Sequence, residues 1–178
     1  MKKINRKNSK FGKNIAFIGF RGTGKSTIAK LLGKKLKRNY YSIDAIVEKK
    51  FGETISSLVK TKGWKYFRDL ECNELKAMNL EREVIIDCGG GIVLRKKNRE
   101  LLRKNSFVVL LEADVDTIEK RISKDKNRIR LSKKKTLREE IESQLLKRNK
   151  YYEELADVVF NSSQLTKEVI VSKIIFSM

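Results

Sequence analysis

Residues 14–26 read Asn-Ile-Ala-Phe-Ile-Gly-Phe-Arg-Gly-Thr-Gly-Lys-Ser, an apolar run followed directly by a glycine-rich turn. This order predicts a β-strand that ends in a loop with the pattern G-x-x-x-x-G-K-[ST], which residues 19–26 fill. Glycine lets the backbone N–H groups of such a loop point at phosphate oxygens, because no Cβ stands in the way. The sequence therefore predicts a site for the phosphates of ATP or GTP.

The residues of this turn have separate roles in the predicted phosphate site. Lys25 is expected to reach the β- and γ-phosphates, and the hydroxyl of Ser26 is expected to hold Mg²⁺. A helix predicted from Thr27 to about Lys37 would direct the positive end of its dipole at the same anion. The candidate nucleotide-binding residues are Gly22, Thr23, Gly24, Lys25, Ser26 and Thr27.

Composition limits the kind of protein to which this site can belong. The chain has 178 residues, 40% hydrophobic and 36% charged, which fits one folded domain with a highly charged surface. No apolar run approaches the about 18 residues of a membrane span, and the first residues lack the apolar segment of a secretory signal. We therefore expect a cytoplasmic, monomeric protein that makes no membrane contact.

The formal net charge of +20 favours anionic partners and would support nonspecific adsorption to nucleic acid. The basic residues are spread along the chain, however, without the interleaved aromatic residues of a surface that binds single strands. A solvated, lysine-rich surface is the simpler interpretation, so no specific nucleic-acid partner is expected.

Residues 1–13 are basic and without periodicity, and we expect them to form a mobile tail. Residues 14–178 are expected to form a single domain in which strands alternate with helices. Such alternation predicts a parallel sheet with helices on both faces, a three-layer α/β sandwich. The charged segment 123–135 interrupts this pattern and is expected to act as a lid.

Local signals set the expected elements. Further strands are predicted at residues 40–43, 84–86, 107–111 and 158–160, and further helices at 55–60, 64–80, 95–103, 114–122, from 136 and from 166. Asp44 is expected to begin a helix that Gly52 stops, and Asp114 to cap the helix that follows it. Thr136 and Glu139 fit a capping box.

Charged and glycine-rich features follow the predicted strands, where ligands gather in open parallel sheets. Asp44 follows one strand, and three glycines, residues 89–91, follow another. Arg68 could join them from its helix, because a guanidinium holds a carboxylate by two parallel hydrogen bonds. Arg128 and Arg148 could add positive charge over the phosphates, with surface ion pairs as the alternative interpretation of these arginines.

Taken together, these features resemble the shikimate kinase family. The motifs are the phosphate loop at 19–26, Ile43-Asp44 with Glu48 and Gly52, Phe67-Arg68-x-x-Glu71, Gly89-Gly90-Gly91, and Arg148 followed by Tyr152. The resemblance extends from residue 14 to about residue 176. It implies a P-loop kinase fold with a five-stranded parallel sheet in the order 2-3-1-4-5. It also implies transfer of the γ-phosphoryl group of ATP to the 3-hydroxyl of shikimate, in aromatic amino-acid biosynthesis.

The resemblance also implies roles for single residues. Asp44 would contact the ring hydroxyls and serve as the base, while Arg68 and Arg148 would clamp the carboxylate. Arg128 matches a lid arginine that closes over the phosphates, and Arg121 matches an arginine near the adenine. The candidate catalytic residues are Lys25, Asp44 and Arg128, and the candidate substrate-binding residues are Asp44, Arg68, Gly89, Gly90, Gly91 and Arg148.

The chain departs from the family pattern in two places. The family usually has Asp-x-Asp where this chain has Ser42-Ile43-Asp44, and the missing carboxylate is the one associated with Mg²⁺. Asp87 ends a neighbouring strand where shikimate kinases have a small polar residue, so we expect Ser26 and Asp87 to serve the metal. The alternative is that Asp87 only caps the glycine turn. The second departure, Ile129 after Arg128 in place of proline, affects only lid stiffness.

Two rival functions stay open at this level. One is a related kinase for gluconate or a nucleoside monophosphate, since gluconate is also a carboxylated polyol. The other is a nucleic-acid-associated ATPase, which the +20 charge would suit and which predicts polynucleotide-stimulated, salt-dependent hydrolysis.

Overall fold

A computed structural model of the chain describes residues 13–78, 83–124 and 136–178. The predicted tail lies outside these ranges except for Lys13, and the predicted lid lies outside them except for Ser123 and Lys124. Arg128 is among the residues outside. The expectations for the tail, the lid and this arginine therefore stay predictions.

Five strands form one parallel sheet in the order β2-β3-β1-β4-β5, which confirms the predicted order. The strands are β1 (Asn14–Ile18), β2 (Tyr40–Ser42), β3 (Ile85–Asp87), β4 (Ser106–Glu112) and β5 (Val158–Asn161). Every residue of the central strand β1 is buried, as a strand covered on both faces requires. Its side chains alternate between two apolar clusters, with Ile15 and Phe17 in one and Ala16 and Ile18 in the other.

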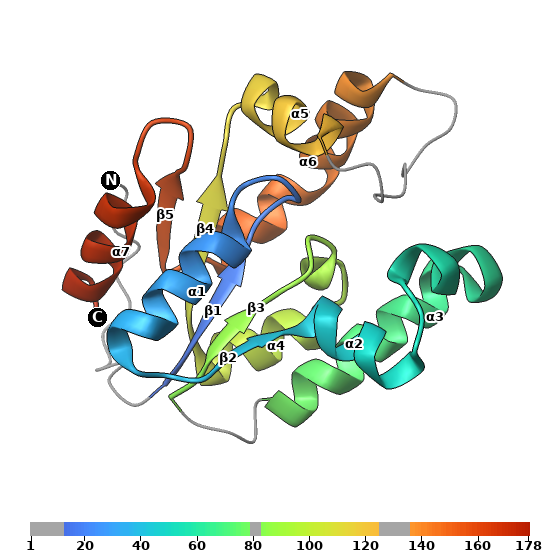
Figure 1. The fold of residues 1–178 in the computed structure, drawn as a ribbon, viewed down its shortest axis with the longest axis horizontal. Coiled ribbons are helices and arrows are strands. Elements are labelled where there is room, and N and C mark those ends of the chain that lie inside the picture. The colour runs from blue at the N-terminus through green and yellow to red at the C-terminus, as the bar shows by residue number, and fades with distance from the viewer. Residues whose placement is uncertain (1–12, 79–82, 125–135) are drawn as a thin grey trace.

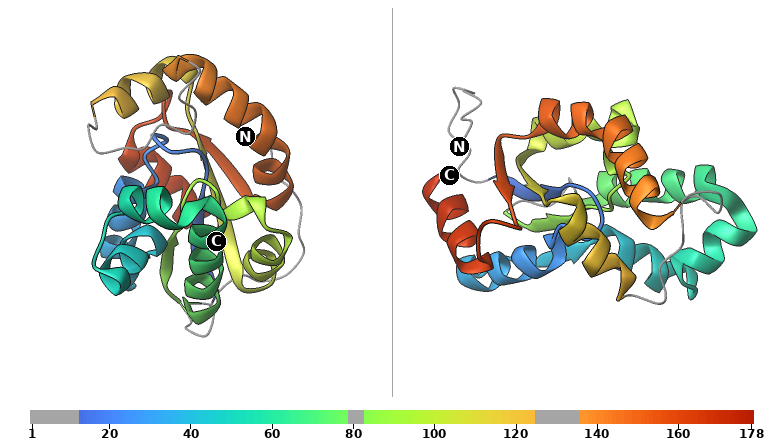
Figure 2. Two further views of the ribbon diagram at one scale, coloured as in Figure 1. Left: turned by 90° about the vertical axis from the view of Figure 1, so that its right-hand side faces the viewer. Right: turned by 90° about the horizontal axis from the view of Figure 1, so that it is seen from above.

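Helices cover both faces of the sheet, which confirms the predicted three-layer sandwich. They are α1 (Lys25–Leu36), α2 (Ile43–Phe51), α3 (Ile55–Met78), α4 (Lys96–Asn105), α5 (Val115–Ser123), α6 (Leu137–Leu155) and α7 (Lys167–Phe176), with a short 3₁₀ helix η1 (Ile92–Leu94). The helices α1 and α7 lie on one face, and α4 and α6 lie on the other (Figures 1 and 2). The helices α2 and α3 pack together beside the edge strand β2 (Figure 1).

The second strand ends one residue earlier than predicted, because Ser42 caps the next helix. Its side chain accepts a hydrogen bond from the N–H of Ala45 at 3.3 Å. Asp44 therefore lies inside the first turn of α2 and does not begin the helix. Gly52 ends α2 in the left-handed region, at φ 68°, as predicted.

The two helices predicted on either side of residues 61–63 are continuous in α3 except for one break. Gly63 has φ 82° and ψ 166°, a conformation that is strained for residues with a Cβ. The break divides α3 into a short first part and a longer second part, and the second part carries the Arg68 motif.

One predicted cap is confirmed and another is wrong. Thr136 and Glu139 form the capping box, in which the Glu139 N–H donates to Thr136 Oγ1 at 3.2 Å and the Thr136 N–H donates to Glu139 Oε2 at 2.7 Å. Asp114 precedes α5 but makes no side-chain cap bond. Its carboxylate instead accepts a hydrogen bond from the Asn161 amide at 3.1 Å, because the end of β5 lies beside it.

Candidate active site

The phosphate loop connects β1 to α1 at the carboxyl end of the sheet (Figure 1). Gly22 and Gly24 have φ values of 84° and 87°, in the left-handed region that favours glycine. Gly24 is the N-cap of α1, and the exposed side chains of Ser26 and Thr27 follow in the first turn. The N-terminus of α1 therefore opens toward the space that the phosphates would occupy.

Side-chain donors hold the loop from within. The amine of Lys25 is buried and donates to the carbonyl oxygen of Phe20 at 3.0 Å. The hydroxyl of Thr23 donates to the same oxygen at 2.8 Å, and this side chain is only 1% exposed. The Thr23 hydroxyl is thus engaged inside the loop, whereas the Lys25 amine lies across it.

Arg121 of α5 joins the phosphate loop to the segment after β5. Its guanidinium donates to the carbonyl of Gly22 at 3.1 Å and to the hydroxyl and carbonyl of Ser162 at 3.0 and 3.1 Å. The Ser162 hydroxyl in turn donates to the carbonyl of Thr23 at 2.9 Å. The predicted adenine-side arginine therefore lies at the edge of the phosphate loop. Ser162 was not predicted, and no local pattern marks it.

Arg68 lies on the other side of the site, in the second part of α3. Its guanidinium pairs with the fully buried Glu71 and lies 5.1 Å from the ring centroids of both Trp64 and Phe67. A Cβ on Gly91 would overlap this guanidinium, so the absence of a side chain at Gly91 leaves room for Arg68 in this position. These contacts fix Arg68 so that it faces the glycine turn that follows β3.

Arg148 approaches the same turn from another helix, α6. Its guanidinium donates to the carbonyl of Gly90 at 3.2 Å and to the side chain of Gln144 at 2.6 Å. The hydroxyl of Tyr152 also donates to the Gly90 carbonyl. Burial lowers the pKa of Arg148 and raises that of Tyr152 to about 12. The two predicted carboxylate clamps therefore meet at residues 90 and 91.

Two carboxylate oxygens beside Gly89 have no partner among the described residues. These are Oδ1 of Asp44 and Oε1 of Glu71, and both are buried. A Cβ on Gly89 would lie 2.6 Å from the first and 2.5 Å from the second. Burial raises the pKa of both groups, to about 7 for Glu71, while Lys25 opposes the shift at Asp44 and Arg68 opposes it at Glu71. Buried acceptors of this kind are stabilised by a ligand that supplies hydroxyl donors.

Asp87 lies at the end of β3. It is 4% exposed, and in the parallel register it lies between Phe17 of β1 and Ser42 of β2. The hydroxyl of Tyr40 donates to Asp87 Oδ2 at 2.9 Å. The same hydroxyl also interacts with the side chains of Ser26 and Ser42, and burial together with the charge of Asp87 raises its pKa.

The hydrogen bonds of Asp87 test the capping interpretation. Among the described residues its carboxylate accepts a hydrogen bond from Tyr40 and none from the glycine turn. The turn is closed by its own backbone, since the Ile92 N–H donates to the carbonyl of Gly89 at 3.0 Å. The capping interpretation is therefore wrong. The sequence does not predict the contact of Tyr40 with Asp87, because a tyrosine in a short strand is typical of ordinary packing.

Cys88 separates Asp87 from the glycine turn. It is a free thiol with 1% exposure, and burial together with the charge of Asp87 raises its pKa. The other cysteine, Cys72, is also free and buried.

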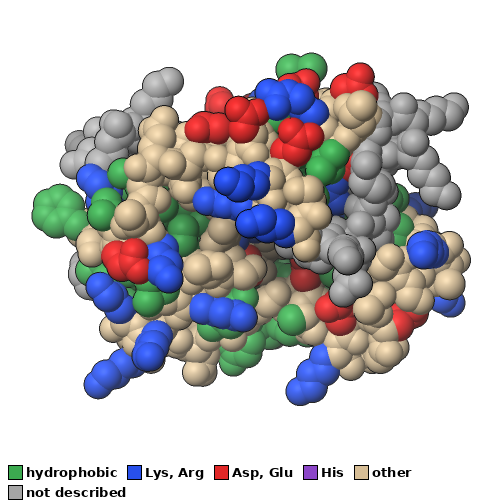
Figure 3. Space-filling model, turned by 45° about the horizontal axis from the view of Figure 1, so that its top comes forward, with side chains coloured by type: hydrophobic (Ala, Val, Ile, Leu, Met, Phe, Trp, Pro, Cys, Tyr) green, Lys and Arg blue, Asp and Glu red, His purple; other side chains and the backbone are tan. Residues whose placement is uncertain are grey.

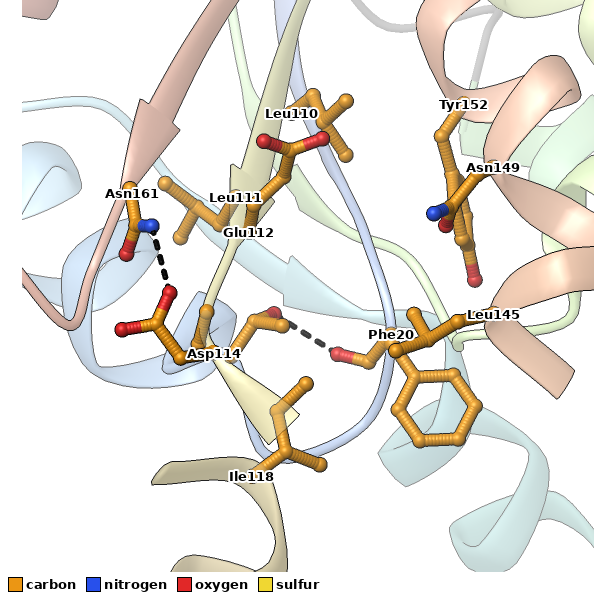
Figure 4. A pocket seen from close by; sticks show the side chains of 12 residues that line it. Phe20, Leu110, Leu111, Glu112, Asp114, Ile118, Leu145, Asn149, Tyr152 and Asn161 are labelled. Carbon is orange, nitrogen blue, oxygen red and sulfur yellow. Dashed lines mark hydrogen bonds between the residues drawn. The ribbon is translucent and has the colours of Figure 1, made fainter. Parts of the chain in front are cut away.

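A cavity of about 220 Å³ lies behind the phosphate loop, between α6 and the strands β4 and β5 (Figure 4). Phe20 enters from the loop and points toward Leu145 of α6 (Figure 4). Tyr152 also lines this cavity, so the side chain that holds Gly90 separates the cavity from the glycine turn.

Comparison with known proteins assigns this site to a family. The model of the shikimate kinase family matches residues 21–178. A shikimate kinase from Syntrophus aciditrophicus is 34% identical over 174 residues, covering 92% of this chain and 89% of its own length. One from Dehalococcoides mccartyi is 43% identical over 119 residues, covering 67% and 68%. The solved structure of a shikimate kinase from Acinetobacter baumannii in complex with shikimate matches with a TM-score of 0.87 and 28% identity, over 93% of this chain and 92% of its own. The chain belongs to the shikimate kinase family.

Proposed function

We propose that Arg68 and Arg148 hold the carboxylate of shikimate while Asp44 receives the proton of the hydroxyl that is phosphorylated. Membership of the family makes the chain an ATP-dependent kinase that acts on shikimate. The observation that supports these residue roles is the approach of two guanidinium groups, from the two helices α3 and α6, to adjacent residues of the glycine turn.

Phosphoryl transfer asks the protein mainly for positioning and charge stabilisation. The acceptor oxygen forms a bond to the γ-phosphorus, the bond to the bridging oxygen of ADP breaks, and the hydroxyl proton passes to Asp44. The raised pKa of this carboxyl makes it a better proton acceptor than an ordinary aspartate. The charge of Lys25 opposes the shift and favours the ionised form that can take the proton.

The proposed cofactors are ATP and Mg²⁺. Among the described residues no group of three or more acidic, cysteine or histidine side chains could hold a metal ion. This fits Mg²⁺, which keeps several waters and is bound mainly through substrate phosphates. Ser26, exposed in the first turn of α1, and Asp87, beside Tyr40, are the residues that would hold it. When bound, the ion neutralises phosphate charge.

The role of Asp87 has its own test. Asp87→Asn should raise the Mg²⁺ concentration that gives half-maximal turnover, and Ser42→Asp should restore part of the loss, since the two residues are register partners. Tyr40→Phe removes the hydrogen bond and keeps the carboxylate, so its effect should be smaller. An unchanged Mg²⁺ dependence in Asp87→Asn, or no rescue by Ser42→Asp, would show that Asp87 does not hold the ion. Ser26, phosphate and water would then be its ligands.

We also propose that the protein acts as a cytoplasmic monomer without a specific nucleic-acid partner. The described part of the chain contains no helix with the length and apolar character needed to cross a membrane. Basic and acidic side chains are interspersed on the face shown in Figure 3. Arg138 of α6 pairs with Asp116, Glu119 and Glu142. The charge of this arginine is therefore locally balanced.

One assay of ADP release tests the proposal, with shikimate, gluconate, a nucleoside monophosphate and a polynucleotide as alternative additions. Only shikimate should stimulate release, and stimulation by the polynucleotide would contradict the proposed partners. The methyl ester of shikimate, which lacks the anionic carboxylate, sharpens the assignment of the clamps. Arg148→Ala should weaken the binding of shikimate much more than the binding of the ester. Equal losses of affinity would show that Arg148 does not hold the carboxylate.

A further inference from the structure

A partly buried ion pair joins the phosphate loop to α6, and the mechanism above does not use it. Arg21, a variable position of the loop pattern, pairs with Glu140 in the first part of α6. The side chain of Glu140 is fully buried and that of Arg21 is 17% exposed. The two residues are 119 positions apart in the sequence, so no local signal connects them.

The same helix carries the acceptor clamp. Arg148 lies about two turns beyond Glu140 along α6 and holds the carbonyl of Gly90. The loop also touches this turn directly, because a Cβ on Gly90 would lie 3.2 Å from the backbone nitrogen of Arg21. The ion pair thus connects the place where ATP phosphates would bind with the helix that would hold the acceptor.

Apolar packing follows the same path. The ring of Phe20 lies 5.8 Å from the guanidinium carbon of Arg21 and 5.7 Å from that of Arg148. It is 1% exposed and packs with Ile141 of α6. The loop and α6 are therefore joined by an ion pair and by an aromatic ring.

An ion pair of this kind is not expected to add much to the stability of the fold. Desolvation of two buried charges offsets most of their attraction, and an apolar pair of similar volume is often as stable. Loss of one partner, in contrast, removes a favourable charge contact without removing the desolvation of the charge that stays, and so lowers stability. What the pair supplies in addition is a defined position of the loop relative to α6.

We propose that Arg21 and Glu140 are positioning residues that couple the nucleotide site to the acceptor site. Nucleotide binding orders the loop, and because Arg21 is fixed to α6, the same event orders Arg148. Each ligand then binds more tightly in the presence of the other, since the ordering of the shared elements is needed once. This inference rests on the proposed role of Arg148 in holding shikimate.

The experiment measures the dissociation constant of shikimate without nucleotide and with saturating ADP and Mg²⁺. Trp64 is the single tryptophan of the chain and contacts Arg68, so its fluorescence reports acceptor binding, with calorimetry as a second measure. The ratio of the two constants is the coupling factor, and couplings of this kind are commonly about 5- to 150-fold. Arg21→Met and Glu140→Gln should each bring the ratio close to one while shikimate still binds alone.

A second variant separates coupling from folding. In Arg21→Met/Glu140→Met both charges are removed, so stability against urea should recover relative to Arg21→Met, whereas the coupling factor should stay close to one. Arg138→Met is the matched control, since Arg138 also links α6 to another helix but is about half exposed and does not contact the loop. It should keep the wild-type ratio.

Three outcomes would overturn the inference: a wild-type ratio of one, an unchanged ratio in Arg21→Met and Glu140→Gln, or the same loss in Arg138→Met. A failure of shikimate to bind the wild-type protein at all would instead contradict the proposed function. The reciprocal titration of ADP, with and without shikimate, must give the same factor.

Discussion

The phosphate loop and the acceptor site present different kinds of chemistry to their ligands. The loop presents backbone, held by glycines in the left-handed region, with the Thr23 hydroxyl engaged inside it. The acceptor site presents charged side chains from α2, α3 and α6, largely buried, with two carboxylate oxygens that lack partners among the described residues. A backbone site is encoded in consecutive residues, whereas a site of side chains exists only once distant elements have packed.

This contrast has an energetic counterpart. Backbone amides carry no titratable group, and Lys25 is the buried charged side chain of the loop, so the loop depends mainly on backbone conformation. The acceptor site concentrates charge in a buried place, and its carboxyl groups respond with raised pKa values. Substitutions in the two regions should therefore differ in whether they change turnover, acceptor affinity or the pH dependence of stability.

The largest effect is expected for Lys25→Ala. This amine is the charged side chain of the loop that acts on the transferred phosphoryl group, so turnover should fall by about 10³-fold with the fold retained. Steady-state kinetics and circular dichroism measure the two quantities. Lys34→Ala, at an exposed position of the same helix, is the control and should match the wild type. Near-normal turnover in Lys25→Ala would show that the loop does not act on the transferred phosphoryl group through this amine.

Conservative changes of the clamps come next. Arg68→Lys and Arg148→Lys keep the charge and lose the planar, two-bond geometry, so the KM for shikimate should rise by about 10- to 100-fold. The KM for ATP should rise much less, because the contact of Arg148 with the loop is indirect, through the ring of Phe20. Separate titration of each substrate tests this, and a parallel rise in both constants would show that the two regions are not distinct.

A pH effect is expected from Glu71. Its pKa is about 7 in the folded protein against an ordinary value of 4.5, so the folded state holds more protons than the unfolded state between these values. The contribution of Glu71 to stability is therefore greatest below pH 4.5 and is lost as the pH rises to about 7.

Glu71→Gln should accordingly show a smaller decline of unfolding free energy between pH 5 and pH 8 than the wild type, measured with urea at about four pH values. Glu100→Gln, at an exposed position, controls for the loss of a charge. Equal slopes in Glu71→Gln and the wild type would show that burial at the acceptor site does not shift this group.

The smallest effect is expected for Ser162→Ala. This change removes two hydrogen bonds at the edge of the loop. The Ser162 hydroxyl donates one to the Thr23 carbonyl and accepts the other from Arg121, so the acceptor is uncharged in both. The KM for ATP should rise by only about 2- to 10-fold, because glycine conformation sets most of the loop. A larger loss would mean that side chains shape the nucleotide site as strongly as the acceptor site.

The difference between the two regions also explains what sequence alone can predict. The loop, its strand and its helix follow from adjacent residues, and the alternation of elements predicts the layers. The sheet order and the clamps came from family resemblance, since α3, β3 and α6 are brought together only by packing. The partners Tyr40 for Asp87 and Glu140 for Arg21 lie 47 and 119 positions apart, where no periodicity connects them.

The wrong expectation for Asp114 and the rejected alternative for Asp87 have the same physical origin. Asp114 has the residue type and the place of a helix cap, but the end of β5 offers it the amide of Asn161. The glycine turn was a reasonable partner for Asp87 by adjacency, but the parallel register places Tyr40 closer to its carboxylate. In both cases a contact across the sheet outcompetes a local one.

The position of Cys88 bears on how the site withstands oxidants. A thiol beside a catalytic turn would ordinarily be a point of attack, because the thiolate is the form that reacts with peroxide, disulfides and alkylating reagents. Here the thiol is enclosed, and the neighbouring carboxylate disfavours its ionisation. The fold thus shields sulfur within its own active site, and activity should persist under oxidative conditions that inactivate enzymes with exposed, acidic cysteines.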